Sequence, residues 1–512
     1  MKRVPWSRLV LIAFVIAAPT IVTSVLLLVL FRATLLDHFS VWSDEIAYQH
    51  QIATFVRAGF GGGYFSFEEQ IAPAGVTHFS AHGPGFPVIY GSLGRLLGWH
   101  QASGPVFNLL VLAIATGVFL WMIRASQRQA AAAGLVILTS WWVLIMAPVT
   151  MQESLHQSVM IIMAGFAARL LQPVTPRRGA LLLTALVILA VASVLRPTNW
   201  IAAAPLVAIG LARRPLLAVI AVVVAGAGLA GFWLLWRYLS APIPNLAIEL
   251  NEIEGGQGTA IILQHLLTQL PANIKGIFAV EGLLQRPFDQ YVMFETVALA
   301  AVCATLAVWA LVAAYSQRAQ AAGSLLTHVP FKVDLFNALA LWMALVAFVG
   351  FYFDDGSSIS RVTAPFLLLS LLVLVATGVR TWLLVAAVTT QLLVAPSFLA
   401  KYRDWRQPGY SYDRSAAVQF EREVSPLMPF AAGLGPWCNT LLTNWYKPEI
   451  AFVPAGIGLT VGEHAEDLPT PIKSRYLLIS GNADEYGQRT RLRHLGTTLG
   501  GNLYLNLDAA CP

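Results

Sequence analysis

Long apolar runs separated by short polar connections fill the first 400 residues of the chain. Runs of about 18 or more residues with almost no charge recur, and each is long enough to cross a bilayer as a helix. The pattern predicts an all-α polytopic membrane domain with about eleven transmembrane helices over residues 1–400. The predicted spans are 9–33, 105–123, 130–149, 154–171, 180–195, 199–212, 215–237, 291–315, 334–352, 363–379 and 382–400.

The composition of the 512-residue chain agrees with lipid as its solvent. Hydrophobic residues make up 57% and charged residues only 11% of the chain, against roughly 25% charged in ordinary soluble domains. The net charge of +6 does not indicate nucleic-acid binding, because surplus Lys and Arg of membrane proteins collect in cytoplasmic loops. The N-terminus resembles a signal peptide, but its apolar stretch continues to about residue 36, so we expect a retained first span.

The charges of the connecting segments predict the orientation. Alternate connections are rich in basic residues, and by the positive-inside rule these lie in the cytoplasm. The N-terminus is then cytoplasmic, and an odd number of spans places the C-terminal part outside a cell membrane (plasma or inner). The basic set consists of Lys2, Arg3, Arg124, Arg128, Arg177, Arg178, Arg213, Arg214, Arg318, Lys332 and Arg380.

Two long connections, 37–104 and 238–290, fall on the outer side together with the tail, 401–512. The tail has a soluble composition, in which "RYLLIS" and "NLYLNLD" predict strands and "DRSAAVQFEREV" predicts a helix. We therefore expect a small extracytoplasmic α/β domain. Cys438 and Cys511 both lie in it, where an oxidising compartment permits a disulfide, although two cysteines alone leave that pairing open. Cys303 falls in a predicted span and is expected to be inert.

Ionisable residues concentrate at the predicted outer ends of several spans, and each needs a reason because charge is costly near lipid. A transporter would more typically place charges at span centres or at broken helices, and the sequence shows neither. The set comprises Asp44, Glu45, His50, His78, His82, Glu153, His156, Arg196, Asp354, Asp355 and Arg361.

The segment "SDEIAY" places two acids in the first turn of a predicted helix, with Ser43 as a plausible N-cap. The acids could simply complement the helix dipole. Alternatively, Asp44 shares a face with Tyr48 and Gln51, at i, i+4 and i+7. A carboxylate held there could act as general base toward an acceptor hydroxyl.

The segment "THFSAHGPGFPVIYGSLGRLLGW" contains His78 and His82, followed by a turn and, from about Phe86, an amphipathic helix suited to the membrane interface. A lone histidine such as His82 is more often a hydrogen-bonded structural residue than a ligand.

Three further ionisable residues lie at predicted outer ends of spans. Glu153 in "MQESLHQ" could complement a helix dipole. Arg361 in "SRVTAP" could snorkel toward water or grip a phosphate with its planar fork of donors. Arg196 in "LRPTNW" is placed at the outer surface by the predicted spans.

Taken in order, these segments resemble the GT-C superfamily of membrane glycosyltransferases, in the protein O-mannosyltransferase and aminoarabinose-transferase branch. The corresponding motifs are "DEIAY", "HGPGFPVIYGSLGRLLG", "MQESLHQ" and "RVTAP", and the resemblance covers about residues 1–400. Gly83 follows His82 where the family has Pro, and Val362 follows Arg361 where the family commonly has Tyr. The first departure leaves the role of His82 open.

The resemblance implies transfer of a sugar from a polyprenyl-phosphate donor to a hydroxyl of a lipid, glycan or protein at the outer face. Asp44 would be the catalytic base, supported by Glu45. His82 would lie near the donor phosphate or the acceptor, and Arg361 would neutralise the phosphate leaving group. The other candidates for contacting the donor or substrate are Tyr48, His78, Glu153 and Arg196.

Cofactor and function retain alternatives at this level. No H-x-x-x-H spacing indicates a zinc site, whereas a loosely held Mg²⁺ or Mn²⁺ on Asp44 and Glu45 stays open. The rival functions are a glycan polymerase or ligase acting on lipid-linked saccharides, and a non-enzymatic lipid or sugar transporter. The early acid pair favours the transferase.

Overall fold

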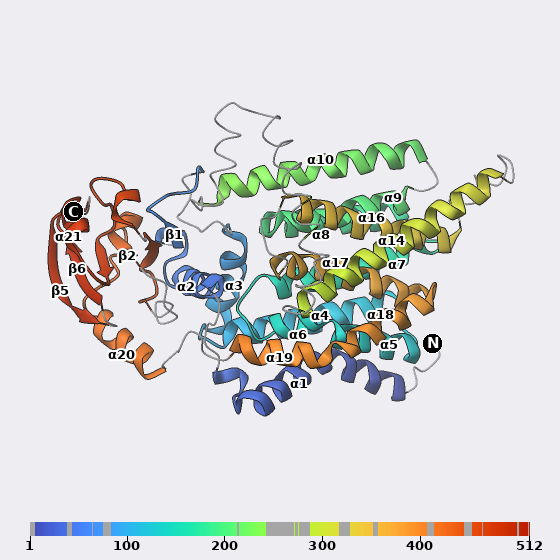
Figure 1. The fold of residues 1–512 in the computed structure, drawn as a ribbon, viewed down its shortest axis with the longest axis horizontal. Coiled ribbons are helices and arrows are strands. Elements are labelled where there is room, and N and C mark those ends of the chain that lie inside the picture. Colours follow the sequence, from blue (N-terminus) through green and yellow to red (C-terminus); the bar gives the residue numbers. More distant parts are fainter. Residues whose placement is uncertain are drawn as a thin grey trace.

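The computed structural model is a helical bundle with a small α/β domain at one end (Figure 1). It describes residues 6–37, 43–63, 65–74, 83–211, 215–241, 287–316, 328–351, 357–406, 414–444, 453–462, 464–498 and 501–509, together with residues 271, 275 and 511. The outer segment 238–290 and the residues Asp354 and Asp355 lie largely outside this part of the chain.

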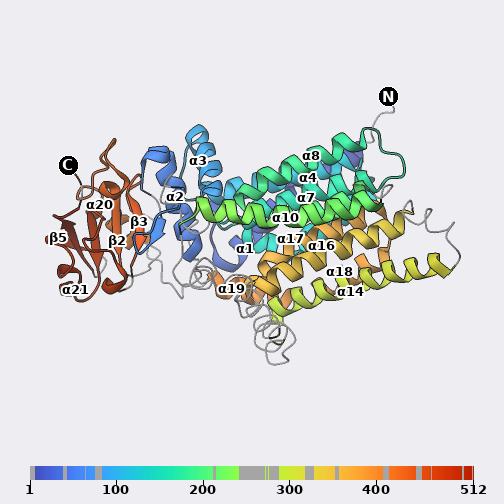
Figure 2. The same cartoon turned by 90° about the horizontal axis from the view of Figure 1, so that it is seen from above.

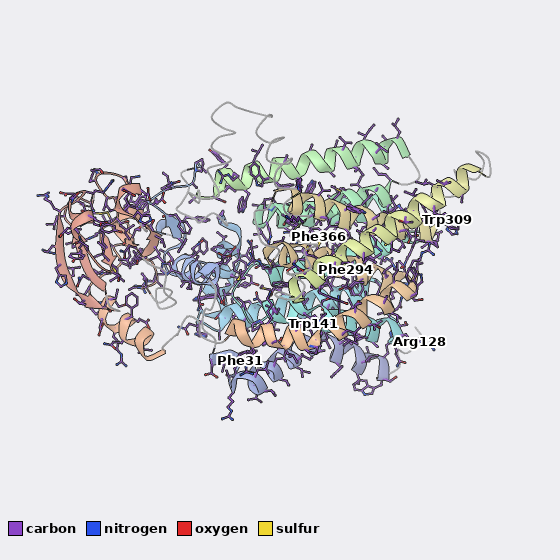
Figure 3. The ribbon with its side chains drawn as sticks, viewed as in Figure 1. Phe31, Arg128, Trp141, Phe294, Trp309 and Phe366 are labelled. Atoms are coloured by element: carbon purple, nitrogen blue, oxygen red, sulfur yellow. A yellow bond between two sulfur atoms is a disulfide. The ribbon has the colours of Figure 1, made fainter. Side chains whose placement is uncertain are left out.

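Within the described residues, eight helices are long and apolar enough to cross a membrane, and a ninth span results if one bent pair is counted. The bent pair is α18 (Thr381–Leu393) and α19 (Ala395–Arg406), with a 46° bend at the break. Apolar side chains cover the flanks of the bundle; Phe294 and Trp309 are 54% and 69% exposed (Figure 3). The eight helices are α1 (Trp6–Phe31), α4 (Ser103–Met122), α7 (Glu153–Leu171), α8 (Arg178–Leu195), α10 (Pro215–Leu239), α14 (Pro287–Ser316), α16 (Val329–Phe351) and α17 (Ser357–Thr377).

The two other predicted spans are helical but broken. The 130–149 segment forms α5 (Gln127–Thr139) and α6 (Trp141–Met146), because Ser140 leaves the helical region with ψ 82°. The 199–212 segment forms the 3₁₀ helix η3 (Pro197–Ala202) followed by α9 (Ala203–Gly210). Every predicted span therefore corresponds to helix, but these two are built from pieces too short to cross a bilayer alone.

Two helices of the first outer segment, α2 (Ser43–Ala58) and α3 (Gly85–Leu97), lie between the bundle and the α/β domain (Figures 1 and 2). Both were predicted. Helix α3 buries Phe86 and Tyr90, whereas Leu96 and Leu97 are 81% and 65% exposed, as expected for a helix at a membrane interface. The short 3₁₀ helices η1 (Leu35–Asp37) and η2 (Gly59–Gly61) flank α2.

The α/β domain is built on a six-stranded sheet in the order β1-β3-β2-β4-β6-β5. Strands β1, β3, β2 and β4 are mutually parallel. Strand β6 is antiparallel to β4, and β5 is antiparallel to β6. The sheet has two apolar clusters: Phe420 of the predicted helix α20 packs with Leu441 and Leu478 in one, and Leu442, Leu477 and Tyr486 belong to the other. The elements are β1 (Phe65–Phe67), β2 (Thr440–Thr443), β3 (Gly458–Val461), β4 (Tyr476–Ile479), β5 (Leu492–Thr498), β6 (Gly501–Asn506), α20 (Arg414–Val424), α21 (Asp484–Gly487), η5 (Pro436–Asn439) and η7 (Ala465–Asp467).

The edge strand β1 comes from the first outer segment and was not predicted. It pairs in parallel with β3, and the turn that follows inserts Glu69 into the domain. Both Glu69 carboxylate oxygens accept hydrogen bonds, from the Lys473 and Ser474 amides at 2.7 Å each. Burial raises the pKa of this carboxyl, and the amide bonds oppose that shift. The sheet thus joins chain segments nearly 400 residues apart. Helix α19 continues through residue 400, where the predicted membrane domain ends.

The Cys438–Cys511 pairing left open by the sequence is made. The two residues form a disulfide with Cα atoms 5.5 Å apart, closing a separation of 73 residues within the α/β domain. Cys303 is a buried free cysteine in the predicted span that forms α14.

Candidate active site

Four ionisable side chains from separate parts of the chain meet at the end of the bundle nearest the α/β domain. Arg196 Nη1 lies 3.2 Å from Glu153 Oε1, and Arg361 Nε lies 3.4 Å from the same oxygen. Arg361 Nη1 also lies 3.9 Å from Asp44 Oδ2. We call Asp44, Glu153, Arg196 and Arg361 the charged cluster. All four were predicted candidates, and the fold brings them together.

Helix ends deliver three of these groups. Asp44 is in the first turn of α2, and Glu153 is the first residue of α7. Arg196 immediately follows the last residue of α8. Acids at helix N-termini and a base at a helix C-terminus each complement the helix dipole. The dipole interpretation is therefore compatible with a site, because the same dipoles hold the charges in place.

Exposure separates the members of the cluster. The Glu153 side chain is 2% exposed, and those of Arg196 and Arg361 are 10% and 11% exposed. Asp44 is 33% exposed and is the most solvent-accessible member. Glu153 therefore fits a positioning role, in which one buried carboxylate fixes two guanidiniums.

Tyr48 lies one turn after Asp44 on α2, fully buried, with its ring 5.0 Å from that of Phe86. Burial raises the pKa of this phenol well above its usual value, and the nearby Glu153 and Asp44 charges raise it further. Tyr48 is thus a neutral phenol beside the cluster. The predicted shared face of Asp44 and Tyr48 is present.

Glu45 has a different environment from its neighbour Asp44. It is completely buried, and its Oε1 accepts a hydrogen bond from the Thr150 amide at 2.6 Å. The same connection between α6 and α7 is held by Asn108, whose Nδ2 donates to Val149 O at 2.5 Å. Glu45 therefore orients the segment that leads into Glu153, and its geometry is that of a positioning residue.

Several polar groups near the cluster were not proposed as site residues. His156 and Gln157 are 2% and 1% exposed, and within the described residues neither His156 ring nitrogen nor either Gln157 amide atom has a hydrogen-bond partner. The Gln51 amide is likewise buried and unpartnered there. The His156 ring instead contacts Phe366 edge-on at 5.5 Å. The sequence signal was the polar run "QESLHQ" at the start of an apolar span.

A buried acid inside a span was not among the predicted candidates. Glu295 of α14 is 8% exposed, and both its oxygens lie 3.2 Å from Gln391 Nε2 of α18. Gln391 lies at the α18–α19 bend, so a buried charge-bearing residue and a helix break occur together.

The metal prediction stays open. Across the described part of the chain, no group of three or more His, Cys, Asp or Glu is arranged to hold a metal ion. His78 and His82 lie outside the described residues. Glu45 is completely buried and its Oε1 accepts a hydrogen bond from the Thr150 amide, whereas the Asp44 side chain is 33% exposed, so of the predicted pair Asp44 is the more available ligand.

Comparison with known proteins gives a distant likeness. No protein-family model and no curated protein matches the chain. The chain is similar to the crystal structure of ArnT from Cupriavidus metallidurans bound to undecaprenyl phosphate, with 14% identity over 97% of this chain and 98% of that one and a TM-score of 0.40. The apo state of the same ArnT gives 14% identity, 96% and 97% coverage and a TM-score of 0.39.

Proposed function

We propose that the chain is a GT-C-like membrane glycosyltransferase that transfers a sugar from a polyprenyl-phosphate-linked donor to an acceptor hydroxyl at the outer face of the membrane. The observation that carries the proposal is the charged cluster. A partly exposed carboxylate, Asp44, lies 3.9 Å from a mostly buried guanidinium, Arg361. Such a pair can serve the two charged events of glycosyl transfer from a phosphate donor, proton removal and departure of an anion.

In the proposed reaction the acceptor oxygen attacks the anomeric carbon of the donor sugar. A new carbon–oxygen bond forms as the bond between that carbon and the phosphate oxygen breaks. The acceptor proton passes to the Asp44 carboxylate, which acts as general base. The polyprenyl phosphate leaves with the bonding electron pair.

The leaving phosphate gains negative charge in the transition state, and a preorganised guanidinium stabilises that charge at little reorganisation cost. Arg361 is suited to this role because its planar fork of donors matches phosphate oxygens. Glu153 holds Arg361 and Arg196 at 3.4 and 3.2 Å, so both guanidiniums are positioned before the donor arrives.

The location also fits a lipid-linked donor. The charged cluster lies at the end of the bundle where α2 and α3 adjoin the α/β domain (Figure 2). Exposed Leu96 and Leu97 of α3 suit contact with lipid. A donor could keep its polyprenyl tail in the bilayer there while the acceptor (lipid, glycan or protein) approaches from the outer solvent. By the positive-inside rule this end faces outward and the N-terminus is cytoplasmic.

The test uses Asp44→Asn in the purified full chain, assayed with a panel of polyprenyl-phosphate sugars. Transfer should fall by at least about 100-fold, the usual contribution of a general base, while the melting temperature stays near that of the parent. Asp37→Asn, an exposed acid just before α2, is the matched control and should keep activity. Full transfer by a folded Asp44→Asn protein would remove Asp44 from the mechanism.

A transporter is the second candidate, and a specific observation favours it. The buried Glu295 and the helix breaks at Ser140 and Val394 supply the features of transporters that the sequence did not show. A transport assay separates the two functions. If the protein is a transporter, the Asp44→Asn variant should still move its lipid or sugar substrate across the membrane of proteoliposomes as the parent does. A polymerase or ligase would instead need a lipid-linked oligosaccharide as donor in the transfer assay.

A further inference from the structure

A pocket lies within the bundle, one helical turn from the charged cluster. On α7 it is lined by Gln157, four residues after Glu153, and on α17 by Ala364 and Leu368, three and seven residues after Arg361. These spacings return to the same helix face. The cavity offers about 20 Å³ to the centre of a water-sized particle, and it is partly open to its surroundings. Its polar lining residues include Thr139, Ser140, Gln157, Tyr291, Glu295 and Gln391.

Glu295 is the only acid that lines this pocket, and no Lys, Arg or His is among the described lining residues. The other buried acids of the described spans differ: Glu153 contacts two guanidiniums, and Asp334 Oδ2 lies 2.9 Å from Arg380. A carboxylate buried at membrane depth needs either a counter-charge or a proton. At 1.5 Å per residue, Glu295 lies about 12 Å along α14 from Pro287.

Two helix ends converge on the same place. Helix α5 ends at Thr139 and α18 ends at Leu393, and Thr139, Gln391 and Val394 all line the pocket. The C-terminal end of a helix carries partial negative charge. In membrane proteins such half-helix C-termini accompany cation sites. The ends of α5 and α18 therefore add negative potential at the pocket, where Glu295 already supplies a formal charge.

Neutral oxygen ligands are also present. Gln157 Oε1 and Gln391 Oε1 are buried without a hydrogen-bond partner among the described residues, and both side chains line the pocket. Gln391 Nε2 is already used on Glu295, and Trp141 Nε1 donates to the main-chain carbonyl of Gln391 at 2.8 Å, which fixes that segment. Carboxylate and amide oxygens without a basic neighbour form a donor set for a hard cation.

We propose that this pocket binds a small monovalent cation, Na⁺ or a proton, with Glu295 as its anionic ligand and Gln157 and Gln391 as neutral ones. The proposal does not depend on the transferase reaction. Tyr291 is the other titratable side chain among the described lining residues. In a transferase the site would stabilise the bundle beneath the charged cluster, and in a transporter it would hold a coupling ion.

The experiment follows the melting temperature of the purified full chain in detergent as Na⁺ replaces choline at constant ionic strength. Binding to the folded state raises the melting temperature in a saturable way. For Na⁺ we expect this rise in the parent and in the control Glu421→Gln, an exposed acid of α20, and its loss in Glu295→Gln. Gln157→Leu keeps the carboxylate and should raise the half-saturating Na⁺ concentration about tenfold, the worth of one hydrogen-bond-strength contact.

Infrared difference spectra of the parent minus Glu295→Gln test whether the bound cation is a proton. A protonated carboxyl band at neutral pH, present in the parent and absent from Glu295→Gln, assigns the cation as a proton. A saturable Na⁺ effect without that band assigns Na⁺. Absence of both signals would overturn the proposal. If Glu295→Gln does not fold, the parent and Gln157→Leu decide it, since identical Na⁺ curves and spectra in the two would also refute the site.

Discussion

The charged cluster and the Glu295 pocket bury a carboxylate in the same bundle in two different ways. At the cluster, Glu153 contacts two guanidiniums within 3.4 Å, so charge neutralises charge. At the pocket, Glu295 contacts an amide at 3.2 Å, and the described residues around it bring no basic group. Burial of Glu153 depends on partner side chains. Burial of Glu295 depends instead on a cation or a proton from the surrounding medium. Substitutions that remove one charge should therefore have unequal effects at the two places.

The largest difference should appear between Glu153→Gln and Glu295→Gln. Glu153→Gln leaves two buried guanidiniums without their shared carboxylate, and breaking a buried pair costs about 3–5 kcal/mol of folding free energy. Glu295→Gln removes a charge that has no buried basic partner in the described structure, and should cost less than about 1 kcal/mol at low Na⁺. Denaturant titration of both variants measures this, and equal losses would contradict the distinction.

Arg361→Ala tests whether the cluster is chemical as well as structural. Loss of one preorganised charge donor should lower kcat by about 10²–10³-fold, and Arg361→Lys should recover only part because Lys lacks the bidentate fork. Arg380→Ala is the matched control, since Arg380 also pairs with a buried acid but away from the cluster. Its kcat per folded molecule should be unchanged. Comparable kcat losses for Arg361→Ala and Arg380→Ala would argue against a catalytic role.

His50 extends the comparison to a buried base whose hydrogen-bond partner among the described residues is a neutral carbonyl. Its Nε2 lies 2.7 Å from the Ile457 carbonyl oxygen, so Nε2–H donates and joins α2 to the α/β domain. Burial lowers the pKa of His50 from 6.5 to about 4. The folded state binds the His50 proton less readily than the unfolded state does. Neutral His50 therefore contributes fully to folding stability above pH 6.5, and this contribution is lost as the pH falls toward 4.

The loss should reach at most about 3 kcal/mol and loosen the contact between α2 and the domain. Hydrogen exchange of the α2 amides at pH 7 and pH 5 measures it. His50→Gln keeps an amide donor without a titrating ring and should flatten this dependence. A parent protein whose α2 protection, after correction for intrinsic exchange, is equal at both pH values would rule out the assignment.

The smallest effect is expected for Glu45→Gln, which compares the two adjacent acids of α2. The Gln side-chain oxygen can still accept the hydrogen bond from the Thr150 amide, so stability should change by about 1 kcal/mol or less. Activity should stay within several-fold of the parent. A loss as large as that of Asp44→Asn would restore Glu45 to the chemistry and reopen its role as a cation ligand.

Much of the fold was predictable because it depends on local patterns. Uncharged runs long enough to span a bilayer gave every helical span, and "SDEIAY" and "GFPVIYGSL" gave α2 and α3. The alternating strands of the tail gave β4 and β6. The breaks inside 130–149 and 199–212 were not predicted, because an apolar run has the same composition whether or not its backbone stays helical.

The candidate site was predictable only as a set of residue types at one end of the bundle. The sequence proposed Asp44, Glu153, Arg196 and Arg361 individually. For Asp44, Glu153 and Arg361 it also offered an ordinary structural explanation. It could not show that one Glu153 oxygen contacts both guanidiniums. Nor could it separate Asp44 from Glu45, since adjacent helix positions point about 100° apart and only packing decides which one is buried.

The sequence by itself determined the solvent of the protein, the positions of its spans and the collection of ionisable residues at one end. These follow from hydropathy and helix geometry, which act over a few turns. Tertiary structure alone decided that β1 joins a sheet nearly 400 residues away. It also decided that Glu295 meets Gln391 at a helix break and that Asp44 stays accessible while Glu45 does not. Those outcomes depend on contacts between distant segments, whose pairing no local pattern of a single chain encodes.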